Sequence, residues 1–502
     1  MSLSIDLGLG QPMEHMLRSC VLALRIADHI GVTELGKKRI FYANLLAWIG
    51  CHADSSELAA LFTDDIAFRA DYYLIDAHGL PMLSLMLRHA AMGARPLPRT
   101  GNRVRFALES ARTVRSLITS HCNSAGALAG RVGLDAGTAS MLACTFERWD
   151  GAGLPLGLRG SAIPLEMRIT QLADTAEVFL RTAGFTATVD MVSRRGGTQF
   201  DPSLAELFCS NALVLTEGLF ELDPWVAALH AAPTEWPMGE DELDSLLRAI
   251  GDFADLKSPG AAGHSRNVAT LVSSAAGLLG LSAEQTVILR RAAWTHDIGR
   301  MGVSNKIWDA TAPLSTVDTE HLHRYPELSE RILSRIPGLR DAARIAGAHR
   351  ERLDGSGYPR GLGGEELTGP QRLLAVADAY QGMLEPRRHR PAFTPVEATS
   401  RITEIAAHGR LDAKCVDAVL MVAGQPVSRP APGVAGLTPR ELQVLRLACR
   451  GLSGREVAEY LRISPKTARN HVEHIYTKTG ATNRVELTLY ALDQRLLDRD
   501  WY

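Results

Sequence analysis

The sequence predicts an all-α protein with two related helical domains followed by a small helix-turn-helix domain. Apolar residues recur at helical spacing, as in Cys20, Leu24, Ala27 and Ile30, and strand-like alternation is scarce. One stretch of the N-terminal half reappears 204 residues later, and the C-terminal segment contains repeated helix-start patterns. We therefore expect domains at residues 1–230, 240–424 and 436–502, with a proline-rich linker at 425–435.

Composition limits the class of protein. With 502 residues and 46% hydrophobic content, the chain can build several separate cores. The formal net charge of -2 excludes a basic coat over the whole surface, so any nucleic-acid contact must come from a local patch. The seven cysteines form no Cys-x-x-Cys pair, and no apolar run is long enough to cross a membrane. These features predict a cytoplasmic protein without a membrane partner.

An internal repeat defines the first two domains. Residues 147–155 (ERWDGAGLP) align with residues 351–359 (ERLDGSGYP), and Asp174 aligns with Asp378 at the same separation of 204 positions. Upstream, His15 and His264 each precede a glycine by sixteen residues. Two matches at one separation, in the same order, indicate two copies of one domain.

The second copy contains a concentration of metal-binding side chains. His296 and Asp297 are adjacent and offer an imidazole nitrogen and carboxylate oxygens at one point of the backbone, which suits a divalent metal ion. Asp378 lies in an apolar helical segment, where a carboxylate is costly to bury unless a cation compensates it. Together with His264, these residues predict a metal site.

This order of residues, with the run from Asp354 to Pro359, resembles the HD-GYP subgroup of the HD superfamily of metal-dependent phosphohydrolases. Characterised members of that subgroup hydrolyse cyclic dinucleotides. The resemblance implies metal ligands at His264, His296, Asp297, His349 and Asp378. It implies catalytic roles for His296, Asp297 and Arg300. It implies ligand binding by Arg350, Asp354, Gly355, Gly357, Tyr358 and Pro359, where the glycines permit a tight turn that brings backbone amides near an anion.

Two positions of the second copy depart from the family pattern. Tyr325 precedes Pro326 where members with two or three metals have a histidine, and Arg350 follows His349 where they have a second histidine. We therefore expect one divalent ion, such as iron or manganese, rather than two, with an empty site as the alternative. The Arg350 guanidinium can partly neutralise a phosphate in place of the second metal.

The first copy has lost most of this pattern. Aligning Trp48 with Trp294 places the sequence Trp-Ile-Gly-Cys-His-Ala-Asp opposite Trp-Thr-His-Asp, which separates the histidine from the aspartate. Thr145 stands where His349 stands in the second copy. A framework without its central pair should hold a metal poorly. We expect the first copy to have a structural or sensing role.

The C-terminal segment predicts a helix-turn-helix. Thr438 to Glu441 and Ser453 to Glu456 are capping boxes, and Ser464-Pro465 starts a third helix. In that third helix Ala468, Val472 and Ile475 are spaced to face a core. Arginine and asparagine on the opposite face suit base edges in the major groove of DNA.

These residues, with Gly480 after the third helix, resemble the LuxR-type DNA-binding domain. The resemblance implies base contacts by Arg469 and Asn470, with His471 on the same helix. It implies phosphate contacts by Lys466, Thr467, Lys478 and Arg484. The apolar stretch from residue 483 to 497 completes the core or pairs two copies, so we expect a homodimer on double-stranded DNA.

Together these features predict a transcriptional regulator in which the helical body senses or hydrolyses a phosphoester ligand, such as a cyclic dinucleotide. The alternative is an active metal-dependent phosphodiesterase with a DNA-tethering domain. A third possibility is an interaction scaffold with neither metal nor ligand. The retained residues favour the active phosphodiesterase over the scaffold; they are His264, His296, Asp297 and Asp378. Tyr325 and Arg350 weigh against the active phosphodiesterase.

Overall fold

A computed structural model describes residues 1–52, 54–91, 101–131, 133–232, 239–388, 390–427, 437–461, 463–494 and 496. Within these ranges the chain is helical and forms no strand, only three isolated β-bridges. The all-α prediction is therefore confirmed. Most of the proline-rich linker predicted at 425–435, and most of the connector between the copies, lie outside the described residues.

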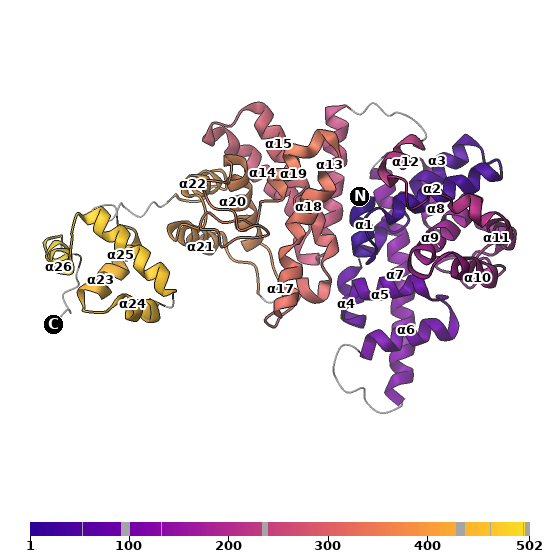
Figure 1. The fold of residues 1–502 in the computed structure, drawn as a ribbon, viewed down its shortest axis with the longest axis horizontal. Coiled ribbons are helices and arrows are strands. Elements are labelled where there is room, and N and C mark those ends of the chain that lie inside the picture. Colours follow the sequence, from indigo (N-terminus) through magenta and orange to yellow (C-terminus); the bar gives the residue numbers. More distant parts are fainter. Residues whose placement is uncertain are drawn as a thin grey trace.

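The first copy, residues 1–232, is drawn in indigo to magenta in Figure 1. Its helices are α1 (Ser2–Gly8), α2 (His15–His29), α3 (Glu34–Leu46), α4 (Ser55–Phe62), α5 (Asp65–Leu74), α6 (Gly79–Ala91), α7 (Gly101–Arg131), α8 (Ala136–Leu142), α9 (Leu165–Ala183), α10 (Phe185–Arg195), α11 (Pro202–Thr216) and α12 (Pro224–His230). The short 3-10 helix η1 (Ile49–His52) follows α3.

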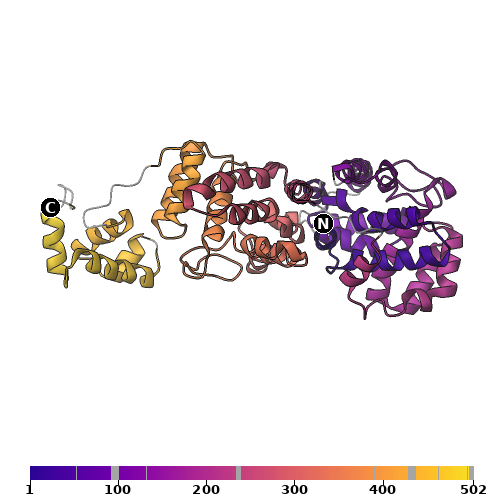
Figure 2. The ribbon, with the colours of Figure 1, turned by 90° about the horizontal axis from the view of Figure 1, so that it is seen from above.

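The second copy, residues 239–427, lies beside the first, and the two views agree on this (Figures 1 and 2). Its helices are α13 (Glu240–Asp255), α14 (His264–Ala276), α15 (Ala283–Thr295), α16 (Asn305–Trp308), α17 (Thr316–His323), α18 (Tyr325–Leu333), α19 (Arg340–Ala346), α20 (Gly369–Met383), α21 (Pro395–Ala407) and α22 (Ala413–Val422). The 3-10 helix η5 (Ile298–Gly302) follows α15.

The two copies repeat the same local structure. In the first, the Glu147 carboxylate accepts hydrogen bonds from two loop amides, those of residues 156 and 158. In the second, Glu351 accepts from the amides of residues 360 and 362. Each loop contains a glycine, Gly153 or Gly357, on which a Cβ would come within 2.5 Å of the glutamate Cα. The internal repeat read from the sequence is therefore a repeat of structure.

The two copies share one hydrophobic cluster, and the first copy has a second large cluster of its own. Leu3 and Ile5 of α1 belong to the same buried cluster as Ile298 and Met301 of η5, and α1 packs against η5. Because η5 directly follows His296 and Asp297, the first copy supports the part of the second copy where the predicted metal ligands lie. The two copies therefore pack against each other through buried apolar side chains.

A buried ion cluster also joins the copies. Asp65 of α5 accepts hydrogen bonds from the Ser304 hydroxyl at 3.0 Å and the Asn305 amide at 2.8 Å, at the start of α16. Arg69 donates to the same carboxylate at 2.8 Å, and the Lys257 ammonium lies 3.6 Å away. Burial opposes ionisation, but the two cations hold the pKa of Asp65 well below its usual range. Asp65 is therefore an anion held between two cations of different copies.

Replacing Asp65 with asparagine should destabilise the helical body by about 3 kcal/mol or more, because it leaves buried Lys257 and Arg69 without their counter-ion. Chemical denaturation measures this loss. The matched control is D190N, which removes a carboxylate from an exposed position. Adding K257M to D65N should recover part of the loss, and equal stability of D65N and wild type would contradict the buried pair.

The C-terminal domain forms its own core. Its helices are α23 (Pro439–Cys449), α24 (Gly454–Leu461), α25 (Pro465–Thr479) and α26 (Arg484–Asp493), drawn in yellow in Figure 1. Thr438 and Glu441 form the predicted capping box, the Ser464 hydroxyl caps α25, and Gly480 ends α25 with a φ of +74°. Ala468 and Ile475 are fully buried in this core, as the helical spacing predicts.

None of the described helices combines the length and the apolar composition that a membrane crossing requires.

Candidate metal centre

His296 and Asp297 lie at the end of α15, where the chain turns into η5. Gly299 makes this turn possible, because a Cβ there would lie 2.1 Å from the Tyr325 carbonyl oxygen of α18. The Gly299 amide donates to the Ser329 hydroxyl at 2.9 Å, and that hydroxyl donates to the His296 carbonyl at 2.6 Å. The backbone of the pair is thus fixed against α18.

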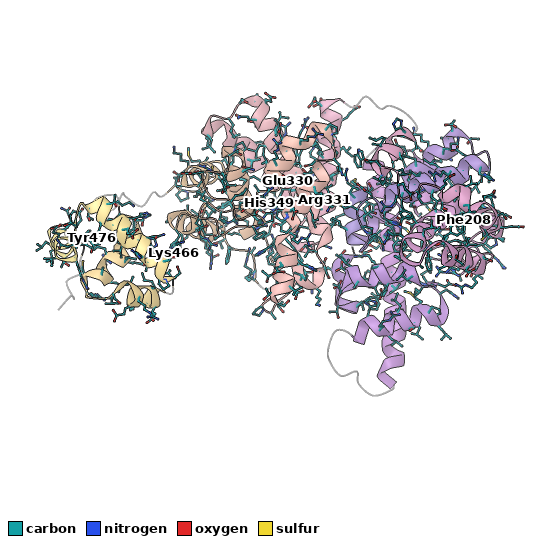
Figure 3. The ribbon with its side chains drawn as sticks, viewed as in Figure 1. Phe208, Glu330, Arg331, His349, Lys466 and Tyr476 are labelled. Atoms are coloured by element: carbon teal, nitrogen blue, oxygen red, sulfur yellow. The ribbon has the colours of Figure 1, made fainter. Side chains whose placement is uncertain are left out.

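The predicted ligands converge inside the second copy. The Nε2 atoms of His264 and His296 are 3.3 Å apart, and they lie 3.3 and 3.7 Å from Oδ1 of Asp378. Oδ1 of Asp297 lies 3.7 Å from Nε2 of His296 and 3.6 Å from Nε2 of His349. All five side chains are buried, and Figure 3 places His349 within the helices of the second copy. Three ring nitrogens and two carboxylates therefore form one buried cluster, in which His264, His296 and Asp297 have the most closely grouped ligand atoms.

The outer ring nitrogens orient these histidines. Nδ1 of His264 lies 2.8 Å from the Glu385 carboxylate, whereas Nδ1 of His296 and of His349 face the backbone carbonyls of residues 293 and 346. Burial opposes a charge on His264, but Asp378 and Glu385 raise its pKa to about 10. Because each Nδ1 has a partner outside the cluster, each Nε2 faces the carboxylates of Asp297 and Asp378. Metal-binding histidines in proteins have this arrangement.

The donor set fits a divalent metal ion. Oδ1 of Asp297 and Oδ2 of Asp378 are buried and have no hydrogen-bond partner. Arg300 and Arg350 contact the two carboxylates, but these two oxygens remain available to a metal ion. His264, His296 and Asp297 bring their ligand atoms within 4.8 Å of one another. The residues present would therefore hold a metal through imidazole nitrogens and carboxylate oxygens.

Tyr325 and Arg350 close one side of this centre. The Tyr325 hydroxyl lies 2.8 Å from Nε2 of His349, and Nε of Arg350 donates to that hydroxyl at 2.6 Å. The Arg350 guanidinium also lies 3.3 Å from Oδ1 of Asp378. A cation therefore already sits beside His349 and Asp378. The side chain of Arg350 remains 21% exposed, so it joins the buried centre to the surface.

Arg300 acts on Asp297 rather than at the surface. Its guanidinium donates to Oδ2 of Asp297 at 2.7 Å and lies over the Trp308 ring at 3.9 Å. The side chain is 1% exposed, so it holds the carboxylate in place from behind. This contact suits a positioning role, and the catalytic role that the family resemblance implies for Arg300 stays a prediction.

The loop from Asp354 to Pro359 follows Arg350, and three of its amides are already engaged. The Gly355 amide donates to a backbone carbonyl, and the Ser356 amide donates to Asp354 at 3.0 Å. Tyr358 donates its amide to the Arg350 carbonyl, and its ring stacks on His323 with centroids 4.0 Å apart. These three amides stabilise the turn itself, so the expectation that the loop cradles an anion gains no support from them.

The first copy has a different arrangement at the equivalent place, and the alignment of Trp48 with Trp294 is wrong. Gly50 packs against the His121 carbonyl as Gly299 packs against the Tyr325 carbonyl. Gly50 also follows His15 by 35 residues, the same separation as between His264 and Gly299. Trp48 therefore replaces Asp297. Packing against the neighbouring helix, which composition does not reveal, sets this register.

The Trp48 indole occupies the space of a metal ligand. Its Nε1 donates to Oδ2 of Asp174 at 2.9 Å, and Nε2 of His15 lies 3.0 Å from Oδ1 of the same carboxylate. Burial opposes a charge on His15, but Glu177 and Asp174 raise its pKa to about 10. An imidazolium and an indole N–H thus satisfy the carboxylate that faces the metal centre in the second copy.

Six of the seven predicted DNA-binding residues lie on α25, and Arg484 begins α26. Lys466, Thr467, Arg469 and Asn470 are exposed, His471 is partly buried, and Arg484 at the start of α26 is exposed. Arg469 lies 3.2 Å from Glu473 on the same helix. Lys478 instead pairs with the buried Glu441 carboxylate at 2.7 Å, which ties α25 to α23. Its predicted phosphate contact competes with this structural ion pair.

The sequence did not predict the roles of three residues, Glu385, Tyr325 and Trp48. Glu385 lies two residues beyond the last residue of α20, so the helical periodicity that places Asp378 does not place Glu385. The roles of Tyr325 as a partner of His349 and of Trp48 as a replacement for a ligand depend on contacts between distant segments. No local pattern predicts those contacts.

Comparison with known proteins finds two family matches along this chain. Residues 248–415 match the HD domain family, and residues 435–491 match the bacterial regulatory proteins of the luxR family. The 3′3′-cGAMP-specific phosphodiesterase 3 of Vibrio cholerae is 29% identical over 83% of this chain and 91% of its own length. A putative HTH-type transcriptional regulator of Mycobacterium bovis is 46% identical over 12% of this chain and 7% of its own length.

A crystal structure of a cyclic GMP-AMP-specific phosphodiesterase from Vibrio cholerae matches 84% of this chain and 96% of that chain, with a TM-score of 0.56 and 24% identity. This likeness supports the fold of the helical body. The protein is thus an HD-domain protein that also carries a luxR-family helix-turn-helix domain. Its body is homologous to the HD-GYP phosphodiesterases.

Proposed function

We propose that this chain is a DNA-binding transcriptional regulator whose second copy binds one divalent metal ion and a phosphodiester ligand of the cyclic-dinucleotide class. The observation that carries the proposal is the buried meeting of three histidine Nε2 atoms with two carboxylates that have unpaired oxygens. The luxR-family domain on the same chain supplies the regulatory output. HD-domain phosphohydrolases are metal-dependent as a class, which supports the metal.

A single ion, of iron or manganese, fits the residues best. A bound divalent metal acidifies water and polarises a phosphoryl oxygen. Arg350 lies beside Asp378 at 3.3 Å and supplies a fixed positive charge where a second ion would otherwise stand. Because its side chain is partly exposed, the guanidinium can exchange part of this ion pair for a phosphate oxygen. Tyr325 holds the guanidinium in that position.

Replacing Arg350 with glutamine should weaken cyclic-dinucleotide binding about tenfold or more, because one charge-assisted contact is lost, while metal content stays at the wild-type level. Calorimetric titration with 3′3′-cGAMP and cyclic di-GMP measures the affinity. R344Q removes an exposed arginine of α19 and serves as the matched control. Unchanged affinity of R350Q would rule out this role.

The second candidate is an active phosphodiesterase that its helix-turn-helix domain tethers to DNA. The retained ligands and the long match to a phosphodiesterase favour it. The two candidates separate in one experiment, in which the purified full chain is incubated with a cyclic-dinucleotide panel and Mn²⁺ or Fe²⁺. Turnover by wild type that D297N lacks and D341N retains would establish the enzyme. Saturable binding without turnover supports the regulator, and neither binding nor turnover would refute the proposed ligand class.

A further inference from the structure

The first copy contains a cavity of about 560 Å³. Trp48, Thr145 and Asp174 line it, and these residues occupy the positions that Asp297, His349 and Asp378 hold in the second copy. The volume is within the range of about 300–1,000 Å³ that small-molecule sites occupy. Loss of the metal ligands has therefore left a space at this position that a small molecule can fill.

Aromatic side chains form one wall of this cavity. The rings of Tyr73 and Phe146 lie 5.1 and 5.2 Å from that of Trp48, and Tyr72 is also close to Trp48 at 6.2 Å. The hydrogen bond from Trp48 to Asp174 fixes the orientation of the indole. A rigid aromatic wall of this kind favours a planar ring in the ligand.

A guanidinium without a carboxylate partner lies at the polar part of the same cavity. Arg195 lines the cavity, is half-buried, and donates to Gln199 at 3.1 Å. Among the described residues, no carboxylate lies within ion-pairing distance of Arg195, whereas the neighbouring Arg148 is paired with both Asp76 and Asp150. Burial lowers the pKa of Arg195, the more distant Asp76 carboxylate opposes this shift, and Arg148 and Arg194 lower the pKa further. An anion at this point would supply the missing partner.

We propose that the cavity of the first copy binds a small ligand that joins a planar ring to an anionic group. The ring packs on the wall of Trp48, Tyr73 and Phe146, and the anionic group pairs with Arg195 and accepts from Gln199 when that amide turns toward it. Nucleoside monophosphates and aromatic carboxylic acids share this chemistry. The site is separate from the metal centre and gives the first copy a sensing role that does not depend on the function of the second.

Calorimetric titration of the full chain with GMP and, separately, with indole-3-acetate tests this site without added metal. We expect saturable binding of one of the two probes, which identifies the nucleotide or the aromatic acid as the class. R195Q should weaken that binding about tenfold or more. The cavity-filling variant A77W should abolish it, because Ala77 lines the cavity and the new ring would occupy the space of the ligand.

Two charge-matched controls locate the binding. Arg194 is exposed and does not line the cavity, so R194Q should bind like wild type. R350Q tests the other possible location, because a probe that bound in the second copy instead would lose affinity in R350Q and keep it in R195Q. The proposal is overturned if neither probe saturates up to about 1 mM, if R195Q binds like wild type, or if R350Q rather than R195Q loses affinity.

Discussion

Replacing Asp297 with asparagine is expected to lower the metal affinity of this protein at least about 100-fold, so that the purified variant retains no stoichiometric metal. Asp297 supplies a buried oxygen without a hydrogen-bond partner and lies within 3.8 Å of three histidine rings. An amide oxygen has the same size but no charge, and its NH₂ group would face the imidazole nitrogens. Elemental analysis after dialysis against Mn²⁺ or Fe²⁺ measures the metal content.

Folding must be separated from metal loss in this experiment. D297N also removes the counter-ion of buried Arg300, so its secondary structure and unfolding midpoint should be recorded with those of wild type. E385Q is a milder second variant, because Glu385 contacts His264, Gln381 and Arg387 but lies behind the ligands, and it should cost about 10- to 100-fold in affinity. Wild-type metal content in both folded variants would show that these residues do not form a metal centre.

Replacing both Arg469 and Asn470 with alanine is expected to remove the sequence preference of the DNA-binding domain, a loss of about 100-fold in discrimination between specific and random duplex. Arg469 is 82% exposed on α25, so the substitution removes no core contact. Selection from a random duplex pool, followed by affinity measurements on the enriched sequence, tests the expectation. An enriched sequence identical to that of wild type would contradict the assignment of these two residues.

A second arginine supplies the control for charge alone. R450A removes a positive charge from the exposed C-terminal end of α23 and should change the affinity for all sequences by a similar small factor. K478A is informative in another way, because Lys478 pairs with Glu441 and its loss should reduce the stability of the domain more than its sequence preference. Together the variants separate base reading, phosphate attraction and structural support.

The sequence by itself determined those features that depend on neighbouring residues. Helical periodicity and capping residues predict the all-α class and the starts of the C-terminal helices, because capping hydrogen bonds join residues three apart, as between Thr438 and Glu441. The internal repeat and the adjacent His296 and Asp297 were also visible, since identity at a fixed separation requires no knowledge of the fold.

Only the tertiary structure decided which distant side chains meet. It placed Trp48 at the position in the first copy that Asp297 holds in the second, where Trp48 donates to Asp174. It also brought Glu385 to His264, Arg300 to Asp297 and Lys478 to Glu441. The physical reason is that a buried charge or indole is stabilised by whatever partner packing brings within about 3 Å, and that partner lies in another helix. The same packing left a cavity where the first copy lacks the metal ligands. No residue pattern in the sequence predicts that cavity.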